Sequence, residues 1–277
     1  MKRIVITGAN SGIGLATAKF LAAQHELILL CRTTQKGEAA KAMILRIAPA
    51  AKITLVPVDL HDLNSVNQAA ALVRAQWESL DVLINNAGYY PDQIAYVGLI
   101  EKTFYASHLG HMLLTLQLLP LLEKSADARV INVSSGLHGR GNVQHFFRQV
   151  PGLTAFQAYA DAKLANVLFT LALHEKLKSN VCAFSLHPGV VATGFDRAIQ
   201  GWFKVLINAV KPLFFISPEA GAATSVYLAT APLSALAQHG GAYFVKSKPA
   251  RIQNAGATAA NAEQLWTKSL AVLQPYL

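Results

Sequence analysis

A glycine-rich turn near the start of the chain constrains the fold more than any other feature. The chain runs from a β-branched segment, Arg3–Ile6, through TGANSGIG at residues 7–14 directly into a helical pattern. Gly8 permits a tight turn, Gly12 lets the backbone approach a pyrophosphate, and Gly14 lets the helix pack close to the strand. The free N–H groups of the helix N-terminus favour the same anion. We therefore predict a dinucleotide site here rather than a purely structural turn. The candidate binding residues are Gly8, Asn10, Ser11, Gly12, Ile13 and Gly14.

Short β-branched runs alternate with longer helical patterns along the rest of the chain. The predicted strands are Arg3–Ile6, Leu27–Leu30, Ile53–Val56, Val82–Ile84, Val130–Val133, Val181–Ser185 and Ala242–Val245. The predicted helices are Ile13–Ala23, Glu38–Ile47, Leu63–Gln76, Phe104–Leu122, Ala158–Leu177 and Pro218–Thr230. Almost continuous apolar strands are typical of a parallel sheet covered on both faces. We expect one α/β domain over residues 1–277, a doubly wound, Rossmann-type parallel sheet of about seven strands, with ligands at the carboxyl ends of the strands.

The composition fits a buried sheet and argues against nucleic-acid binding and against metal or redox chemistry at the cysteines. Hydrophobic residues make up 53% of the chain and charged residues 14%, and the formal net charge is +9. No run of basic residues exceeds Lys2-Arg3, so we expect no nucleic-acid partner. Cys31 and Cys182 lie in apolar runs without metal or redox spacing, which predicts buried thiols in a reducing compartment.

We expect neither a targeting segment nor a metal site. The chain enters a predicted strand at Arg3, and the longest charge-free apolar run, around Leu109–Leu122, is too short for a bilayer and contains Pro120. His108 and His111 lie three residues apart on a predicted helix without a third ligand. These observations predict a cytoplasmic protein.

The end of the second predicted strand indicates which dinucleotide is preferred. NAD sites place an acid there to bond the ribose hydroxyls. Here Cys31 is followed by Arg32, with no acid before Glu38. Arg32 can clamp a 2′-phosphate with its planar guanidinium, and Lys36 can add a second charge. The residues favour NADP(H) over NAD(H); the alternative is a surface arginine at a helix entrance.

Tyr159 and Lys163 are four residues apart in a helical stretch and share one face. An ammonium beside the phenol favours the phenolate and lowers the pKa of Tyr159 from about 10. Tyr159 can then take a proton from an alcohol or return one to a carbonyl. Such a pair alone is more often a solvated helix pair. Its position after a strand that ends in Ser134-Ser135 favours catalysis.

These motifs together resemble the short-chain dehydrogenase/reductase family, and most of all its retinol-dehydrogenase-like and carbonyl-reductase-like branches. The resemblance covers essentially the whole chain. The matching motifs are TGxxxGIG at 7–14, Asp59-Leu60, Asn85-Asn86-Ala87-Gly88, Leu109-Gly110-His111, Asn132-Val133-Ser134-Ser135, Tyr159-x-x-x-Lys163 and His187-Pro188-Gly189. The resemblance implies nicotinamide-dependent hydride transfer between an alcohol and a carbonyl, and Arg32 with Lys36 makes NADP(H) the expected cofactor.

The resemblance also implies roles for individual residues. Asp59 and Leu60 line the adenine, Asn86, Ala87 and Gly88 flank the ribose, Lys163 bonds the nicotinamide ribose, Pro188 and Gly189 shape the nicotinamide pocket, and Thr193 contacts the carboxamide. Ser135, as the second serine of its pair, holds the reacting oxygen beside Tyr159. Ser134 is the alternative.

One residue departs from the family pattern. The family commonly has Asn before Leu-Gly-His, where it holds a water in a proton relay to the lysine, and this chain has Ser107. A hydroxyl still anchors a water, but its reach and donors differ from those of an amide. The alternative to an enzyme is therefore an NADP(H)-binding regulatory or structural protein with weak or no turnover. The complete set of Ser135, Tyr159 and Lys163 favours the enzyme.

The remaining expectations concern substrate and assembly. Residues 194–218 correspond to the family's variable substrate lid, and their apolar content predicts a small lipophilic substrate. A core-packing segment or peripheral membrane contact through 198–216 is the alternative. Many family members pair through the two long helices that match Phe104–Leu122 and Ala158–Leu177. The long segment Leu137–Gly152 either covers that face or folds over the substrate mouth, and we favour a monomer over a homo-oligomer.

Overall fold

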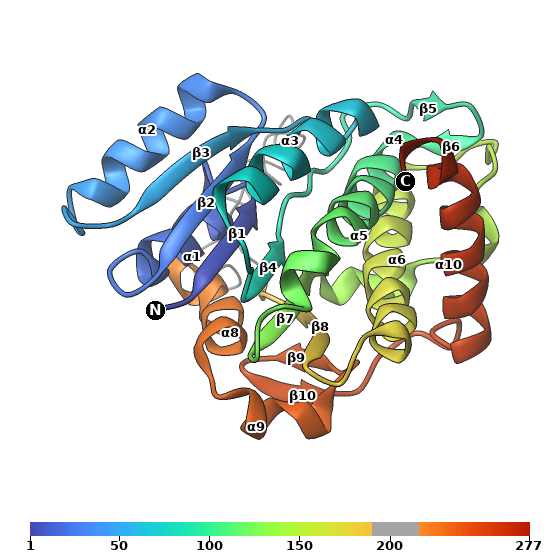
Figure 1. Ribbon diagram of the computed structural model, residues 1–277. Coiled ribbons are helices and arrows are strands. Elements are labelled where there is room, and N and C mark those ends of the chain that lie inside the picture. The colour runs from blue at the N-terminus through green and yellow to red at the C-terminus, as the bar shows by residue number, and fades with distance from the viewer. Residues whose placement is uncertain (190–215) are drawn as a thin grey trace.

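The carboxyl edge of one central sheet organises the molecule. The computed structural model describes residues 1–189 and 216–277 (Figure 1). The sheet has the strand order β10-β9-β8-β7-β4-β1-β2-β3. These strands are β1 Arg3–Thr7, β2 Glu26–Cys31, β3 Ile53–Pro57, β4 Val82–Asn85, β7 Ala128–Val133, β8 Val181–His187, β9 Tyr243–Val245 and β10 Lys248–Ala250. All pairs are parallel except β9 with β10. A separate hairpin pairs β5 Tyr96–Val97 with β6 Ile100–Glu101. The seven predicted strands are confirmed, and β10 adds an eighth.

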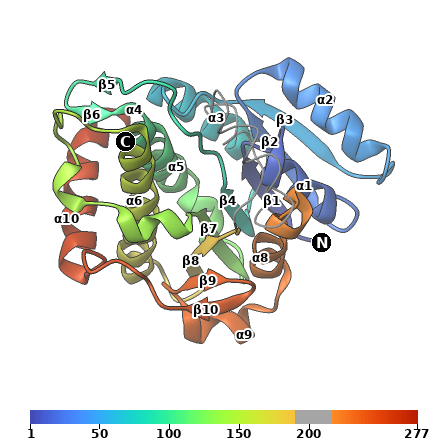
Figure 2. The ribbon, with the colours of Figure 1, turned by 180° about the vertical axis from the view of Figure 1, so that it is seen from behind.

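Helices cover both faces of this sheet, which confirms the doubly wound α/β fold. The α-helices are α1 Gly12–Leu21, α2 Thr34–Leu45, α3 Leu63–Gln76, α4 Lys102–Phe104, α5 His111–Leu122, α6 Ala155–Lys176, α8 Pro218–Thr230, α9 Leu233–Leu236 and α10 Ala259–Leu273. A π-helix, η1 Tyr105–Gly110, joins α4 to α5, and 3-10 turns lie at η2 Gly136–Arg140, η3 Val143–His145, η5 Ala237–His239 and η6 Gln274–Tyr276. Helices α3, α5 and α6 lie on one face, and α1, α2 and α8 on the other (Figures 1 and 2).

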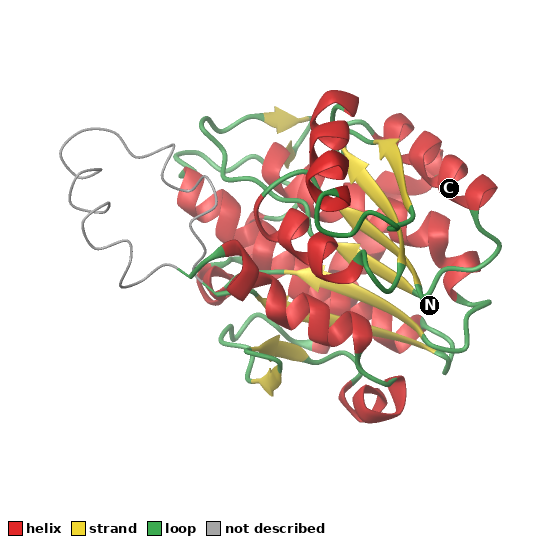
Figure 3. Ribbon diagram, turned by 90° about the vertical axis from the view of Figure 1, so that its left-hand side faces the viewer, coloured by secondary structure: helices red, strands yellow, loops and turns green. Residues whose placement is uncertain are grey.

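Alternating side chains of the strands divide the core between these two layers. Ile4 and Ile6 of β1 pack in one buried cluster, with residues of α1 and α8, whereas Val5 packs in the other, with α3, α5 and α6. Leu27 and Ile28 of β2 separate in the same way. Because the parallel strands share one direction, their carboxyl ends meet at one edge of the sheet (Figure 3).

The C-terminal segment adds an outer layer that the sequence analysis missed. Helix α10 packs beside α6 (Figure 1). Trp266 stacks on Phe169 of α6 with ring centroids 6.1 Å apart. The buried hydroxyl of Ser269 lies 2.7 Å from His108 Nε2. The carbonyl of Tyr276 then accepts hydrogen bonds from α3 and α5. The chain therefore covers the outer side of α5 and α6 with its own C-terminus.

Two further observations concern the cysteines and the length of the apolar helices. Cys31 and Cys182 are free and buried in β2 and β8, as predicted. Among the described residues, no single helix is long and apolar enough to cross a membrane. The helices Pro218–Thr230 and Leu233–His239 reach that length and apolar composition only when they are taken together, and the chain bends by 109° between them.

Candidate active site

A cleft of about 980 Å³ opens at the carboxyl edge of the sheet. The structure brings most of the predicted site residues into its lining. They are Gly8, Asn10, Ser11, Gly12, Ile13, Gly14, Arg32, Lys36, Asp59, Leu60, Asn86, Ala87, Gly88, Tyr159, Lys163 and Pro188. Gly189 follows Pro188 with φ +96°. Thr193 and residues 194–215 of the expected lid lie outside the described residues.

The glycine turn has the shape that a pyrophosphate needs. Gly8 and Gly12 have φ of +65° and +54°, a conformation that favours glycine. A Cβ on Gly14 would collide with the carbonyl oxygen of Gly8, so only glycine lets α1 approach the strand this closely. Ser11, the N-cap of α1, makes no side-chain cap hydrogen bond. The first N–H groups of α1 are therefore left for a ligand, and the turn fits the phosphates of a dinucleotide.

Hydrogen bonds fix this turn against the end of β4. The Thr7 hydroxyl accepts bonds from the backbone N–H groups of Asn86 and Ala87, each at 2.9 Å. Asn86 Nδ2 donates to the Thr7 carbonyl at 2.8 Å. Asn85 Nδ2 donates to Asn132 Oδ1 at 2.8 Å, which ties β4 to β7. The predicted ribose-flanking segment and the predicted phosphate turn thus form one rigid wall.

Cations and one histidine lie at the far end of the cleft. Arg32 and Lys36 line it with exposed side chains. Asp59 Oδ1 accepts from the backbone N–H of His61 at 3.0 Å and lies 3.1 Å from His61 Nδ1. Burial acts to raise the pKa of Asp59, but the bonds from His61 and the charge of Arg32 outweigh it and lower that pKa. His61, which also meets the hydroxyl of Tyr89, was missed because it belongs to no recognised motif.

The two serines after β7 face different partners. Ser134 is buried, and its hydroxyl donates to the Lys163 carbonyl at 2.7 Å. Ser135 Oγ accepts from the Leu137 N–H at 3.2 Å and is hydrogen-bonded to Tyr159. Ser135, not Ser134, therefore faces the tyrosine.

Tyr159 and Lys163 share a face of α6, as their spacing predicts. Lys163 Nζ lies 5.5 Å from the Tyr159 ring centroid and donates to the Val133 carbonyl at 3.0 Å. Lys163 is 3% exposed, and burial lowers its pKa to about 8. Burial raises the pKa of Tyr159 to about 12, and the Ser135 bond only opposes this. The predicted fall in the pKa of Tyr159 is therefore wrong, because desolvation raises that pKa.

Ser107 lies in the π-helix η1 at the inner wall of the cleft. It is 1% exposed, and its Oγ makes no hydrogen bond among the residues that the structure describes. Its carbonyl lies 2.9 Å from His111 Nδ1, and His111 Nε2 lies 2.9 Å from the Thr7 hydroxyl. A π-turn often marks a functional position, and an unpartnered buried hydroxyl in a cleft wall suits a bound water.

A second aromatic ring lies beside the predicted catalytic tyrosine. The Tyr90 ring lies 5.8 Å from the Tyr159 ring and lines the same cleft.

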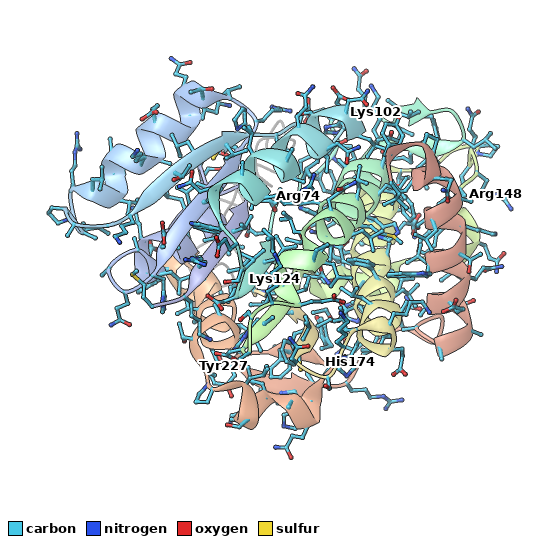
Figure 4. The ribbon with its side chains drawn as sticks, in the orientation of Figure 1. Arg74, Lys102, Lys124, Arg148, His174 and Tyr227 are labelled. Carbon is cyan, nitrogen blue, oxygen red and sulfur yellow. The ribbon has the colours of Figure 1, made fainter. Side chains whose placement is uncertain are left out.

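The basic side chains labelled in Figure 4 lie apart from one another. Arg74, Lys102, Lys124 and Arg148 are spread over the surface rather than gathered in one patch.

Comparisons with known proteins agree with the site. A family model described as short chain dehydrogenase matches residues 2–203. Mouse (Mus musculus) Retinol dehydrogenase 12 is 37% identical, over 98% of this chain and 86% of that protein. Human (Homo sapiens) Retinol dehydrogenase 11 is 38% identical, over 82% and 72%.

Solved structures share the fold at lower identity. The crystal structure of levodione reductase aligns with a TM-score of 0.69 and 20% identity, covering 87% of this chain and 93% of that chain. A short chain dehydrogenase from Shigella flexneri complexed with NADP aligns at 0.66 and 20%, covering 89% and 97%. The motifs, the fold and the relatives lead to one conclusion: the chain belongs to the short-chain dehydrogenase/reductase family of oxidoreductases, in its retinol-dehydrogenase-like branch.

Proposed function

We propose that this oxidoreductase interconverts an alcohol and a carbonyl on a lipophilic small molecule, with NADP(H) as the cofactor. The observation that carries this proposal is the convergence of Ser135 and Lys163 on Tyr159: Ser135 is hydrogen-bonded to Tyr159, and Lys163 Nζ lies 5.5 Å from its ring centroid. Tyr159 and Lys163 line the cleft, and Ser135 directly follows Ser134 in the chain. The glycine turn at the other side of the cleft fits a dinucleotide pyrophosphate.

The side chains supply the proton and orient the substrate. A bound nicotinamide supplies or accepts the hydride. Tyr159 keeps its proton at neutral pH because burial raises its pKa, so it is ready to protonate a carbonyl oxygen. The Ser135 hydroxyl donates to the same oxygen and holds it near the tyrosine. Lys163 adds positive charge beside Tyr159, which stabilises the phenolate that remains after proton transfer.

NADP(H) is favoured over NAD(H) by the charges around the far end of the cleft. No carboxylate ends β2, where an acid would repel a 2′-phosphate. Arg32 and Lys36 carry the cations that a 2′-phosphate needs, and both are exposed toward solvent and the cleft.

A lipophilic substrate is supported by the cleft wall and by the named relatives. Tyr90 lies beside Tyr159 and offers an aromatic surface. Two similar proteins are named retinol dehydrogenases. The apolar sequence at 194–218 supports a lipophilic substrate if it forms the substrate lid, and peripheral membrane contact through 198–216 is the alternative use of the same residues.

The test is NADPH oxidation by the purified protein with a panel of retinal, aliphatic aldehydes, ketones and quinones. The proposal expects turnover of at least one lipophilic carbonyl and loss of that turnover in Tyr159→Phe. Absence of turnover with every member of the panel, despite tight NADPH binding, would favour the non-catalytic alternative that Ser107 raises.

A monomer is supported by the covering of the α5 and α6 face. Helix α10 packs on α6, and the 137–152 segment packs there too, through η2 and η3. Phe146 and Phe147 of that segment lie 4.9 and 5.3 Å from Phe104, ring centroid to centroid. Light scattering coupled to size exclusion should give a mass near 29.7 kDa, the mass of one chain. A dimer or tetramer would contradict this proposal.

A further inference from the structure

The peptide bond between Ser135 and Gly136 is held at both polar ends by histidine rings. The Ser135 carbonyl accepts a hydrogen bond from His138 Nδ1 at 2.7 Å. The Gly136 N–H donates to His187 Nδ1 at 3.0 Å. His138 lies in η2 and His187 ends β8, so the rings reach one planar unit from two elements. Because the peptide is planar, holding its carbonyl and its N–H fixes the dihedral angles on either side.

The partners determine where each ring carries its proton. A carbonyl only accepts, so His138 carries hydrogen on Nδ1. Its Nε2 accepts a hydrogen bond from the Gln253 N–H at 3.1 Å and therefore carries no hydrogen. His187 Nδ1 accepts a hydrogen bond from the Gly136 N–H, so this nitrogen carries no hydrogen either. Burial lowers the pKa of both histidines, and the nearby His138 lowers that of His187 further. Both rings are neutral, with opposite tautomers.

The His138 ring is anchored by a segment far away in sequence. Besides the Gln253 bond, Asn254 Nδ2 donates to the carbonyls of His138 and Gly141, at 2.8 and 2.9 Å. The Tyr243 ring of β9 packs on the His138 ring, with centroids 4.6 Å apart. His138 is 1% exposed. The clamp is thus built into the fold and does not rest on a mobile surface side chain.

The orientation of the Ser135 hydroxyl depends on this backbone. Ser135 is extended, with φ −157° and ψ 158°. Its Oγ accepts the Leu137 N–H, which leaves the hydroxyl proton for donation on the side of Tyr159. A rotation of the Ser135–Gly136 peptide would move Oγ relative to the tyrosine, and catalysis is sensitive to misplacement by about 1 Å.

We propose that His138 and His187 form a neutral histidine clamp that positions the Ser135 hydroxyl against Tyr159. This inference rests on the proposed function, because it concerns the residue that holds the reacting oxygen. Both histidines act through Ser135 and are positioning residues. The clamp supports the chemical step and leaves cofactor binding to the glycine turn.

Asparagine and glutamine variants test each hydrogen bond separately. The Asn amide matches Nδ1 of histidine, and the Gln amide matches Nε2. The His138→Asn side chain keeps the bond to the Ser135 carbonyl, whereas the His138→Gln side chain keeps only the Gln253 bond. The backbone N–H of residue 138 donates to the same carbonyl at 3.1 Å in both variants, so the comparison isolates the bond made by the ring. His187→Asn keeps the acceptor for Gly136, and His187→Gln loses it. We expect each Gln variant to lose about tenfold or more of kcat relative to its Asn counterpart, with unchanged NADPH affinity by titration calorimetry.

Equal kcat in the Asn and Gln variants of both histidines would overturn the clamp, as would a loss confined to NADPH affinity. Nitrogen NMR of labelled histidines gives a readout that needs no turnover. It should find hydrogen on Nδ1 of His138 and a bare Nδ1 on His187, and the reverse at either ring would overturn the clamp. Failure of the unmodified protein to turn over any carbonyl would count against the proposed function instead.

Discussion

Acid should destabilise this protein through two histidines buried behind the cleft. His108 and His111 are 1% and 2% exposed. Burial and then the neighbouring His111 lower the pKa of His108 to about 3. Burial also lowers the pKa of His111 to about 4, with Lys163 adding to the effect and the Ser107 carbonyl opposing it. An unfolded histidine titrates at 6.5, so the unfolded chain takes up protons first as the pH falls.

The sign and the size of the effect follow from these values. The contribution to stability is complete above pH 6.5 and is lost as the pH falls from 6.5 toward the pKa values in the folded protein. Between pH 7 and pH 5, each histidine then reduces the free energy of unfolding by about 2 kcal/mol, or about 4 kcal/mol for the pair. Because domains are commonly stable by only about 5–15 kcal/mol, the loss is large.

Urea unfolding followed by tryptophan fluorescence at pH 8, 7, 6 and 5 measures this loss. His108→Gln keeps an amide near Ser269 but does not titrate, so it should remove about 2 kcal/mol of the pH-dependent part. The matched control is Leu109→Met, a fully buried neighbour, which should shift stability equally at every pH. An unchanged pH slope in His108→Gln would refute the reasoning.

Three further predictions concern the cleft. Arg32→Ala should weaken NADP(H) binding about tenfold or more in calorimetry and leave NAD(H) binding nearly unchanged, because a charge-assisted contact contributes about 1.5–3 kcal/mol. Tighter binding of NAD(H) than of NADP(H) by the unmodified protein would contradict this cofactor preference. Tyr159→Phe should abolish turnover in a steady-state assay while NADPH affinity stays, whereas Lys163→Ala should reduce both; a largely active Tyr159→Phe enzyme would rule out the proton donor. Ser107→Asn should raise kcat or extend the alkaline side of the pH–rate profile, and a fall in kcat with unchanged NADPH affinity would mean that the site is adapted to serine.

The sequence predicted the sheet well because its strands carry local signals. All seven predicted strands are present, and the glycine turn has the positive φ values that it requires. The eighth strand, β10, was missed because its signals are weak. It has three exposed residues including Pro249, and the turn before it uses Lys246 and Ser247 at φ of 50° and 60° instead of glycine.

The C-terminal helix had a signal that was not used. Thr258 caps α10, and Ala262, Leu265, Ser269 and Leu273 repeat at helical spacing as its buried residues. The pattern indicates an amphipathic helix but not its partner. That Ser269 meets His108 on the outer side of the π-helix depends on long-range packing, which periodicity does not contain.

The active site divides in the same way between local and long-range causes. Spacing on one helix places Tyr159 and Lys163 together, because residues four apart share a face. Their protonation depends on how much of the fold covers them, and burial raises the pKa of the tyrosine and lowers that of the lysine. The family resemblance favoured Ser135 over Ser134, and tertiary contacts supply the physical reason, since Ser134 meets the Lys163 carbonyl and Ser135 meets Tyr159. A motif therefore identifies which groups take part, and the packing around them decides which of those groups carries the proton.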